Sequence, residues 1–592
     1  MRSLNLGILA HVDAGKTSLT ERLLHEAGVI DEPGSVDDGN TQTDSLALER
    51  ARGITIKSAV VSFAIGGDVT VNLIDTPGHP DFIAEVERVL GVLDGAVLVV
   101  SGVEGVQAQT RVLMRTLQRL RIPTLFFVNK LDRRGADLAR VLGEVRAKLT
   151  GGAVLPDASC AEVLADHDDA FLSAYLEGEG DWRRELAAQT ARAIAHPVFA
   201  GSAITGAGVA ELIAGVREFL PAHVPDPDGP VSGTVFKVER GPAGEKVAYV
   251  RLRTGTVRLR DRLAGEKVTA ISVFGSDRRD AVRAGEIARV WGLSEVRIGD
   301  ALGEAASSNG RHFAPPTLET VVVPCDERDR GALHLALVQL AEQDPLINLR
   351  EGDETAVSLY GEIQKEVIGA TLAGEFGVEV SFRETTPIHI EKPAGTGAAV
   401  ELIGKGEHGF LATVGLRVQP GPTEFRLEVE LGSMPYAFFR AVEETVLAVL
   451  ARRRVQDCTV TMTHAGYWAR QSSAHGGFDK SMSSTAGDFR GLTPIVLLAA
   501  LRQAGTTAYE PLHRFELELP ADTLGMVLPA LARVRALPDA PVARGEVCLL
   551  AGTLPAANVH ALQQQLPGLT RGEGVMESAF ERYAVMASSW TA

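Results

Sequence analysis

Cysteine is scarce in this 592-residue chain, and long apolar runs are absent. The four cysteines are widely separated and form no metal-binding pattern, so we expect reduced thiols in a cytoplasmic protein. No apolar run is long enough to span a membrane, and the opening Met-Arg-Ser leads directly into a predicted strand. We therefore expect neither a membrane partner nor a signal peptide.

An excess of positive charge is also lacking, because the formal net charge is −17 at pH 7. Affinity for nucleic acid that is independent of sequence comes from neutralised phosphates, so this charge argues against indiscriminate binding. Any RNA contact must be local, and the candidates are residues 452–454 (three arginines) and residues 468–470. A solvated helix face is the alternative interpretation of the three arginines.

A phosphate-binding loop is indicated near the N-terminus, where residues 10–17 read A-H-V-D-A-G-K-T. The motif lies between a predicted strand (residues 4–9) and a predicted helix (residues 18–26), which is the context that such a loop requires. Gly15 allows close approach of the phosphates, Lys16 can reach the terminal phosphates, and the Thr17 hydroxyl can ligate Mg²⁺. The candidate binding residues here are Ala10, His11, Val12, Asp13, Ala14, Gly15, Lys16 and Thr17.

A second motif, D-T-P-G-H at residues 75–79, follows a predicted strand at residues 69–74. Asp75 stands where the second-shell Mg²⁺ ligand lies in phosphate-loop enzymes. Gly78 can offer its N–H to a third phosphate, and His79 can orient an attacking water.

Two further motifs indicate recognition of guanine. Asp132 of the sequence N-K-L-D can accept hydrogen bonds from the N1–H and 2-amino groups of guanine, which adenine does not supply. After a third strand, a backbone N–H of the Ser202–Ala203 pair can meet the guanine O6. Each motif alone also fits a turn or a helix cap, but all four in this order predict a GTP site. The candidate base-binding residues are Asn129, Lys130, Asp132, Ser202 and Ala203.

The segment between the first two motifs, residues 49–56, reads E-R-A-R-G-I-T-I. Thr55 could close over Mg²⁺ and the γ-phosphate when GTP is bound. A charged surface segment that leads into a strand is the alternative. Together with the phosphate loop and D-T-P-G-H, this sequence resembles the signature of translational GTPases.

The resemblance implies GTP and Mg²⁺ as cofactors and ribosome-stimulated hydrolysis of GTP to GDP and phosphate. It implies metal ligation through Thr17, Thr55 and Asp75. The implied catalytic residues are His79, Lys16, Thr55 and Gly78. Val12 and Ile54 match an apolar pair that restrains the histidine in that family, so the free protein should hydrolyse GTP slowly.

The sequence texture changes in steps that predict a multidomain α/β protein. We expect five domains: a P-loop GTPase domain with a doubly wound sheet, a β-barrel domain, and three α+β domains. Domains three and five of the chain resemble the ferredoxin-like domains of elongation factor G. Inside the fourth domain we expect helices at residues 436–453 and 494–504, with a loop before the second. The expected domains are 1–220, 221–308, 309–387, 388–508 and 509–592.

Three features distinguish members of the translational GTPases. Only about seventy residues separate Asn129 from Ser202, too few for the extra subdomain of elongation factor G. The chain also continues beyond the third domain, where peptide-chain release factor 3 stops. Residues 486–497, A-G-D-F-R-G-L-T-P-I-V-L, resemble the A-D-F-R…L-x-P-I-V-L stretch of ribosomal protection proteins. The chain is identified as a member of the tetracycline-resistance ribosomal protection proteins, of the oxytetracycline-resistance type.

This resemblance implies a monomer that binds the 70S ribosome and dislodges tetracycline from the decoding site of the small subunit. The implied partners are small-subunit rRNA near that site and the GTPase-activating region of the large subunit, with no membrane. One alternative is an elongation factor G-like translocase or back-translocase. Another is a GTP-dependent ribosome regulatory factor that displaces no drug.

The sequence departs from the family in two places. The family carries a short Y-[YS]-S-P-V run before A-D-F-R, whereas residues 467–484 are longer and lack the Pro-Val pair. The nearest counterpart of the drug-site loop is Tyr467, Trp468, Ala469 and Arg470. A surface loop rich in Ser and Gly is the alternative for residues 472–477. Family members usually add a helix after the fifth domain, and this sequence stops soon after that domain.

Overall fold

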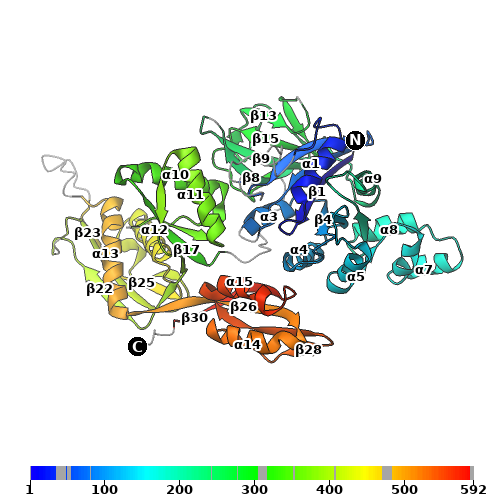
Figure 1. Ribbon diagram of the computed structural model, residues 1–592. Coiled ribbons are helices and arrows are strands. Elements are labelled where there is room, and N and C mark those ends of the chain that lie inside the picture. The colour runs from blue at the N-terminus through cyan, green and yellow to red at the C-terminus, as the bar shows by residue number, and fades with distance from the viewer. Residues whose placement is uncertain are drawn as a thin grey trace.

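The computed structural model describes residues 2–34, 49, 55–79, 82–241, 243–276, 278–303, 316–350, 354–405, 408–469 and 483–586. In these ranges no helix is both long enough and apolar enough to cross a lipid bilayer. Figure 1 shows several packed units, each with its own sheet and helices.

A seven-stranded sheet forms the N-terminal unit, in the order β2-β3-β1-β4-β5-β7-β6. The strands pair in parallel except β2, which runs antiparallel to β3. Buried apolar side chains fill both faces of the central strands, because helices cover the sheet on both sides. The strands are β1 (Arg2–Ala10), β2 (Ala59–Ile65), β3 (Val69–Asp75), β4 (Gly95–Ser101), β5 (Thr124–Asn129), β6 (Ala153–Val154) and β7 (His196–Ala200).

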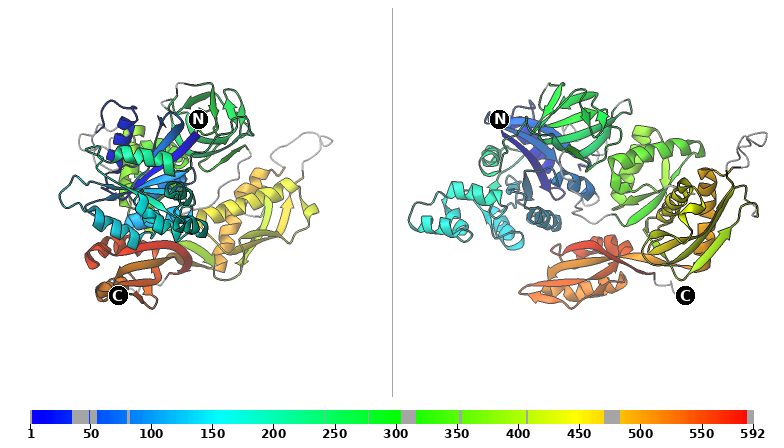
Figure 2. Two further views of the ribbon diagram at one scale, coloured as in Figure 1. Left: turned by 90° about the vertical axis from the view of Figure 1, so that its right-hand side faces the viewer. Right: turned by 180° about the vertical axis from the view of Figure 1, so that it is seen from behind.

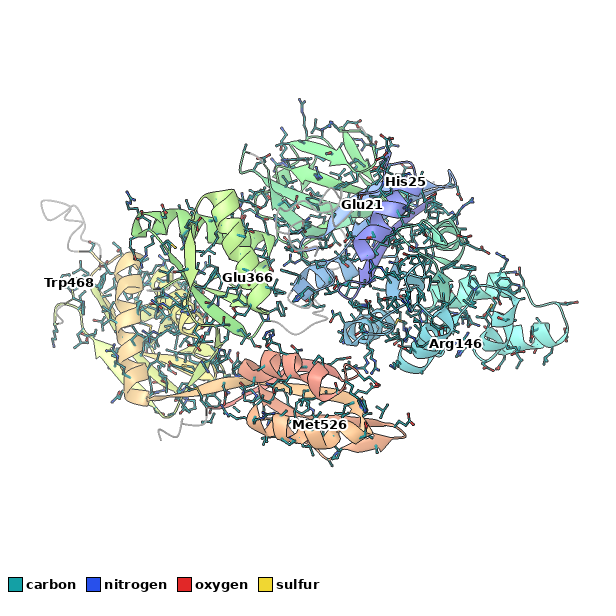
Figure 3. The ribbon with its side chains drawn as sticks, viewed as in Figure 1. Glu21, His25, Arg146, Glu366, Trp468 and Met526 are labelled. Carbon is teal, nitrogen blue, oxygen red and sulfur yellow. The ribbon has the colours of Figure 1, made fainter. Side chains whose placement is uncertain are left out.

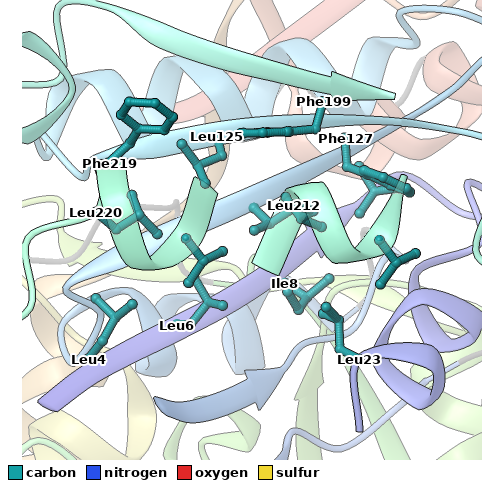
Figure 4. Packing of buried hydrophobic residues seen from close by; sticks show 14 of the residues in the cluster. Leu4, Leu6, Ile8, Leu23, Leu125, Phe127, Phe199, Leu212, Phe219 and Leu220 are labelled. Atoms are coloured by element: carbon teal, nitrogen blue, oxygen red, sulfur yellow. The ribbon is translucent and has the colours of Figure 1, made fainter. Parts of the chain in front are cut away.

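Helices pack on the sheet of this unit, and the loops that lead from the strands into the helices lie at the carboxyl ends of the strands. Leu6 and Ile8 of β1 pack near Leu212 of a C-terminal helix on one face of the sheet (Figure 4). The helices are α1 (Lys16–Glu26), α3 (Ile83–Leu90), α4 (Ala108–Arg119), α5 (Leu138–Lys148) and α9 (Val209–Phe219). Three more helices, α6 (Ala161–Ala165), α7 (Asp169–Leu176) and α8 (Trp182–Ala191), extend outward at the cyan end of Figure 1.

An all-β unit follows, with a five-stranded antiparallel sheet in the order β13-β15-β9-β8-β16. It packs on the first unit through a buried ion pair between Arg251 and Asp94, at 2.6 Å. Asp94 also accepts hydrogen bonds from the backbone and side-chain amides of Asn5. The main strands are β8 (Ser232–Arg240), β9 (Lys246–Thr254), β13 (Ala270–Val273), β15 (Ile287–Trp291) and β16 (Ala301–Gly303).

The next unit places two helices against a small antiparallel sheet, as the sequence predicts. Its central strand is β17 (Leu318–Pro324), which pairs with β18 (Ala356–Leu359) and with β19 (Val380–Phe382). The helices are α10 (Arg330–Gln343) and α11 (Glu362–Phe376).

A four-stranded sheet in the order β22-β23-β25-β24 packs against two long helices, at the end of the molecule opposite α7 (Figures 1 and 2). Helix α12 (Tyr436–Arg453) is confirmed, but the loop predicted before residue 494 is wrong in part. Helix α13 (Ala486–Ala504) begins eight residues earlier, because Thr485 and Asp488 form a capping box and Pro494 lies inside the helix. The strands are β22 (Gly397–Glu401), β23 (Ala412–Pro420), β24 (Glu424–Leu427) and β25 (Cys458–Tyr467).

The C-terminal sheet is built around the long strand β26 (Thr506–Pro520), which contains the expected boundary at residue 508. Its first residues pair with β21 (Ile390–Pro393), and its later ones pair with β29 (Val547–Pro555) and β30 (Val575–Val585). Helices α14 (Leu524–Arg533) and α15 (Val559–Leu569) cover this sheet. The strand thus joins two units without a flexible linker, as the orange ribbon of Figure 1 shows.

The buried pair between Arg251 and Asp94 generates a test of the contact between the first two units. Replacing Arg251 by alanine should lower the free energy of unfolding by about 3–5 kcal/mol, because a buried carboxylate loses its partner. The measurement is denaturant unfolding followed by tryptophan fluorescence. Arg253→Ala is the matched control, since Arg253 is exposed and its hydrogen bond to the Gly91 carbonyl lies at the surface. Equal effects of the two substitutions would contradict the assignment.

Candidate functional site

The phosphate loop connects β1 to α1 through two residues with left-handed backbone. Asp13 has a φ of 63° and Gly15 a φ of 86°. A Cβ atom on Gly15 would lie 2.4 Å from the side-chain nitrogen of Asn129, so only glycine fits there. The N-terminus of α1 begins at the next residue, Lys16, and its free N–H groups face the loop.

Four side chains converge at the phosphate end of the site. The Lys16 ammonium lies 2.6 Å from the Asp75 carboxylate and donates to the Thr55 hydroxyl at 3.0 Å. The Thr55 hydroxyl also lies 3.2 Å from that of Thr17. The side chains of Lys16, Asp75 and Thr55 are buried, so their interactions are weakly screened by water.

These donors fit a magnesium ion. Octahedral Mg²⁺ takes oxygen ligands at about 2.0–2.1 Å, which places neighbouring ligands about 3 Å apart. The hydroxyl oxygens of Thr17 and Thr55 have this separation, at 3.2 Å, and the Lys16 ammonium links Thr55 to the Asp75 carboxylate. The donor set is therefore the hard, all-oxygen type that Mg²⁺ prefers.

The turn after β3 presses against the phosphate loop. A Cβ on Gly78 would meet the Ala10 carbonyl at 3.0 Å, so the turn approaches the loop closely. His79 follows at the edge of the cavity, with its ring 6.0 Å from that of Phe82. Of the apolar pair expected beside His79, Val12 lines the cavity, and Ile54 lies outside the described residues.

Asn129 joins the base-binding motifs to the phosphate loop. Its amide nitrogen donates to the Ala14 carbonyl at 2.9 Å, and its amide oxygen accepts from the Ala203 N–H at 2.9 Å. Because the Ala203 N–H already has this acceptor, a guanine O6 would share it or take it over. Lys130 has a φ of 65°, and Asp132 lies exposed at the cavity edge.

One cavity of about 630 Å³ collects most of the predicted site residues. Ala10, Ala14 and Asp75 are fully buried just behind its wall. The predicted residues that line it are His11, Val12, Asp13, Gly15, Lys16, Thr17, Thr55, Gly78, His79, Asn129, Lys130, Asp132, Ser202 and Ala203.

The sequence missed three charged residues that line this cavity, Glu104, Arg22 and Arg133, and the first two make contacts within it. Glu104 lies 3.5 Å from the Lys130 ammonium and 3.8 Å from the His11 ring. Burial lowers the pKa of His11, although Glu104 opposes this shift. Arg22 of α1 donates to the Ala203 carbonyl at 3.0 Å and so supports the base-binding turn. No local motif marks either residue, because both contacts join distant segments.

The predicted drug-site residues lie far from this cavity, at the end of β25. Trp468 is 42% exposed and lies at the left-hand end of Figure 3, well away from Glu21 and His25 of α1. Tyr467 packs edge-on against Phe438, with ring centroids 5.8 Å apart. Ala469 is exposed, and Arg470 lies outside the described residues.

The three arginines at residues 452–454 are not one free basic patch. Arg454 makes two hydrogen bonds to Glu319, at 2.8 and 2.9 Å, and so joins α12 to β17. Arg452 and Arg453 are exposed.

Comparisons with known proteins cover nearly the whole chain. Residues 1–222 match the family model of the elongation factor Tu GTP binding domain, and residues 507–591 match that of the elongation factor G C-terminus. A crystal structure of a protein from Thermus thermophilus aligns with a TM-score of 0.67 and 23% identity, over 99% of this chain and 98% of that one. That likeness confirms the fold.

Curated relatives are similar over nearly their full length. The oxytetracycline resistance protein of Streptomyces rimosus is 49% identical over 98% of this chain and 95% of its own. The tetracycline resistance protein TetM of Streptomyces lividans is 45% identical over 98% and 96%. The tetracycline resistance protein TetP of Clostridium perfringens is 36% identical over 98% and 94%. On this similarity, and on a GTP-binding domain of the elongation-factor type, the chain belongs to the family of tetracycline resistance proteins.

Proposed function

We propose that this protein is a ribosome-dependent GTPase that binds the ribosome and dislodges tetracycline from the decoding site of the small subunit. The observation that carries the proposal is the pairing of a cavity lined by residues of the four predicted GTP-binding motifs with a separate exposed tip that carries Trp468. The tetracycline resistance of the relatives supports the drug-directed role.

The phosphate end of the cavity supports hydrolysis of GTP. Thr17, Thr55 and Asp75 would hold Mg²⁺, which would supply positive charge that stabilises the phosphates. Lys16 neutralises the terminal phosphates, and the Gly78 N–H faces the third one. His79 orients the attacking water from the open side of the cavity.

Closure around the third phosphate links the nucleotide to the ribosome. Thr55 and Gly78 stand on two segments that GTP would order, and a form bound to GTP would be favoured for docking. The protein would act as a monomer whose exposed tip reaches the drug site. Hydrolysis of GTP then releases the protein from the ribosome. Base–aromatic stacking by Trp468 or Tyr467 contributes about 1–3 kcal/mol, enough for roughly 10- to 100-fold displacement of a drug that uses the same surface.

In vitro translation with tetracycline, with and without the protein and GTP, tests this function. Restored synthesis in the presence of the drug supports protection. Rescue of a reaction that lacks the translocation factor would instead support the elongation factor G-like alternative. An effect on neither reaction, despite ribosome-stimulated GTP hydrolysis, would favour a regulatory factor.

Asp132 should select guanine. Asp132→Asn should shift binding from GTP toward xanthosine triphosphate by about 10- to 100-fold, because hydrogen bonds to a charged group contribute about 1.5–3 kcal/mol. Competition binding measures the preference, and the exposed Asp228→Asn serves as a charge-matched control. Unchanged selectivity would remove Asp132 from the base site.

His79 should act in hydrolysis and leave binding intact. His79→Ala should keep GTP affinity near normal but slow ribosome-stimulated hydrolysis by at least about 10²-fold, since it removes the group that positions water. Single-turnover phosphate release on ribosomes provides the measurement. His25→Ala on the same domain is the matched control, because His25 lies in the last turn of α1 and is not among the residues that line the cavity. Near-normal turnover of the His79 variant would refute this role.

The tip should carry drug release. Replacing residues 467–480 with a short Gly/Ser link should preserve GTP binding and ribosome-stimulated hydrolysis but abolish release of radiolabelled tetracycline. Trp468→Ala should slow release about tenfold, in keeping with the loss of one stacked aromatic. Tyr175→Ala on α7 is the control, because its exposure of 38% is similar. Normal release by the loop-replaced protein would shift the effector role to the hairpin around residues 408–410.

A further inference from the structure

The ladder between β23 and β25 ends at the pair Ala412–Tyr467, directly below the exposed tip. Leu411 and Trp468 are the first residues beyond this pair. At such a point the backbone groups lose their strand partners, and each needs another hydrogen bond or water. The path of the chain beyond this pair therefore depends on what the backbone groups of Leu411 and Trp468 bind.

Ser484 takes the place of the missing ladder bonds. Its hydroxyl accepts a hydrogen bond from the Trp468 N–H at 2.8 Å and donates to the Leu411 carbonyl. Its own N–H donates to the Trp468 carbonyl at 3.1 Å. One serine thus bridges both strand ends and also brings together the two ends of the segment from Trp468 to Ser484.

Asp488 completes the set from the first turn of α13. One carboxylate oxygen accepts from the Leu411 N–H at 3.1 Å, and the other accepts from the N–H and hydroxyl of Thr485, at 2.8 and 2.7 Å. Partial burial opposes ionisation, but the hydrogen bonds from Thr485 and Leu411 hold the pKa of Asp488 below its usual value. All four backbone polar groups of Leu411 and Trp468 are therefore bound by Ser484 or Asp488.

Side-chain packing fastens the same hairpin to α13. A Cβ on Gly491 would lie 2.2 Å from the ring of Phe410, so this ring rests directly on the helix backbone. The neighbouring Phe489 is buried and stacks on Phe438, with ring centroids 4.7 Å apart. On the other side, the Trp468 indole lies 3.9 Å from the position that a Cβ on Gly404 would take, at the far end of the hairpin.

We propose that Ser484 and Asp488 are positioning residues for drug release, because they lock residues 408–411 and Trp468 onto the N-terminus of α13. We call this set of Leu411, Trp468, Ser484, Thr485 and Asp488 the tip clamp. The proposal rests on the proposed function of the tip. It gives the G-D-F-R-G stretch a physical role: Asp488 binds the hairpin, Phe489 anchors the helix in the core, and Gly491 admits Phe410.

The tip clamp predicts a split between two activities of the full-length protein on ribosomes. Ser484→Ala removes both bridging bonds and should slow release of radiolabelled tetracycline at least tenfold, while ribosome-stimulated GTP hydrolysis stays within twofold. Ser484→Thr keeps the hydroxyl and should restore release. Amide hydrogen exchange should quicken at Leu411 and Trp468 in the alanine variant, a local change that general loss of stability would not produce.

Thr445→Ala is the matched control, because it removes a hydroxyl bond to the Ala441 carbonyl inside α12 of the same unit. It should leave drug release unchanged. If Ser484→Ala unfolds the unit, Asp488→Asn provides the second variant: the amide keeps its shape and one acceptor but loses a bond from Thr485, so release should fall several-fold with hydrolysis unchanged.

Normal drug release by a folded Ser484→Ala or Asp488→Asn protein, with fast exchange at Leu411 and Trp468, would overturn the positioning role alone. Equal loss of release in Ser484→Ala and Ser484→Thr would overturn it as well. Failure of the unmodified protein to release tetracycline would instead overturn the proposed function on which the inference rests.

Discussion

The side-chain amide of Asn129 is the contact on which the nucleotide cavity depends. Its strand, β5, lies between β4 and β7 in a parallel sheet, so the loops after these strands meet at one edge. The amide uses one donor on the phosphate loop and one acceptor on the turn at Ala203. A single planar group therefore fixes the distance between the part of the site that holds phosphates and the part that reads the base.

Arginine–carboxylate pairs hold the units of the molecule against one another. Arg88 of α3 pairs with Asp344, and Arg111 of α4 pairs with Glu518 of β26. Arg454 pairs with Glu319 across another boundary. Because Arg88 and Arg111 are nearly buried, these contacts differ from exposed salt bridges, which contribute little. Several of the arginines in this strongly acidic chain are thus engaged in contacts between its own units.

The sequence predicted well the parts of the structure that local chemistry determines. The phosphate loop and the N-K-L-D motif follow buried strands, and strand order alone brings them together. The predicted start of α13 is wrong because proline is common in the first turn of a helix, and Pro494 suggests that position. The helix begins instead after the capping box of Thr485 and Asp488, which is visible in the sequence upstream. The contacts of Glu104, Arg22 and Arg454 could not be predicted, since their partners are distant in the chain.

Domain membership shows a related limit. A change of texture near residue 508 marks a boundary in the sequence, but β26 runs through it without interruption. Backbone pairing with β21 on one side and β30 on the other decides the outcome there, and pairing partners leave no local signal. The functional division of the chain into units therefore need not coincide with the ends of its strands.

One residue, Gly505, separates α13 from β26, and its backbone angles of φ 68° and ψ 154° belong to a region that is essentially reserved for glycine. Helix α13 has 19 residues, and the tip clamp sits at its far end. At 1.5 Å per residue the helix is a lever about 28 Å long, so a rotation of about 5° at Gly505 would carry its end through roughly 2–3 Å. Because α13 packs in one core with β23 and β25, that unit would turn with the helix as one body, and a small rotation relative to the C-terminal sheet would displace Trp468 by a similar distance.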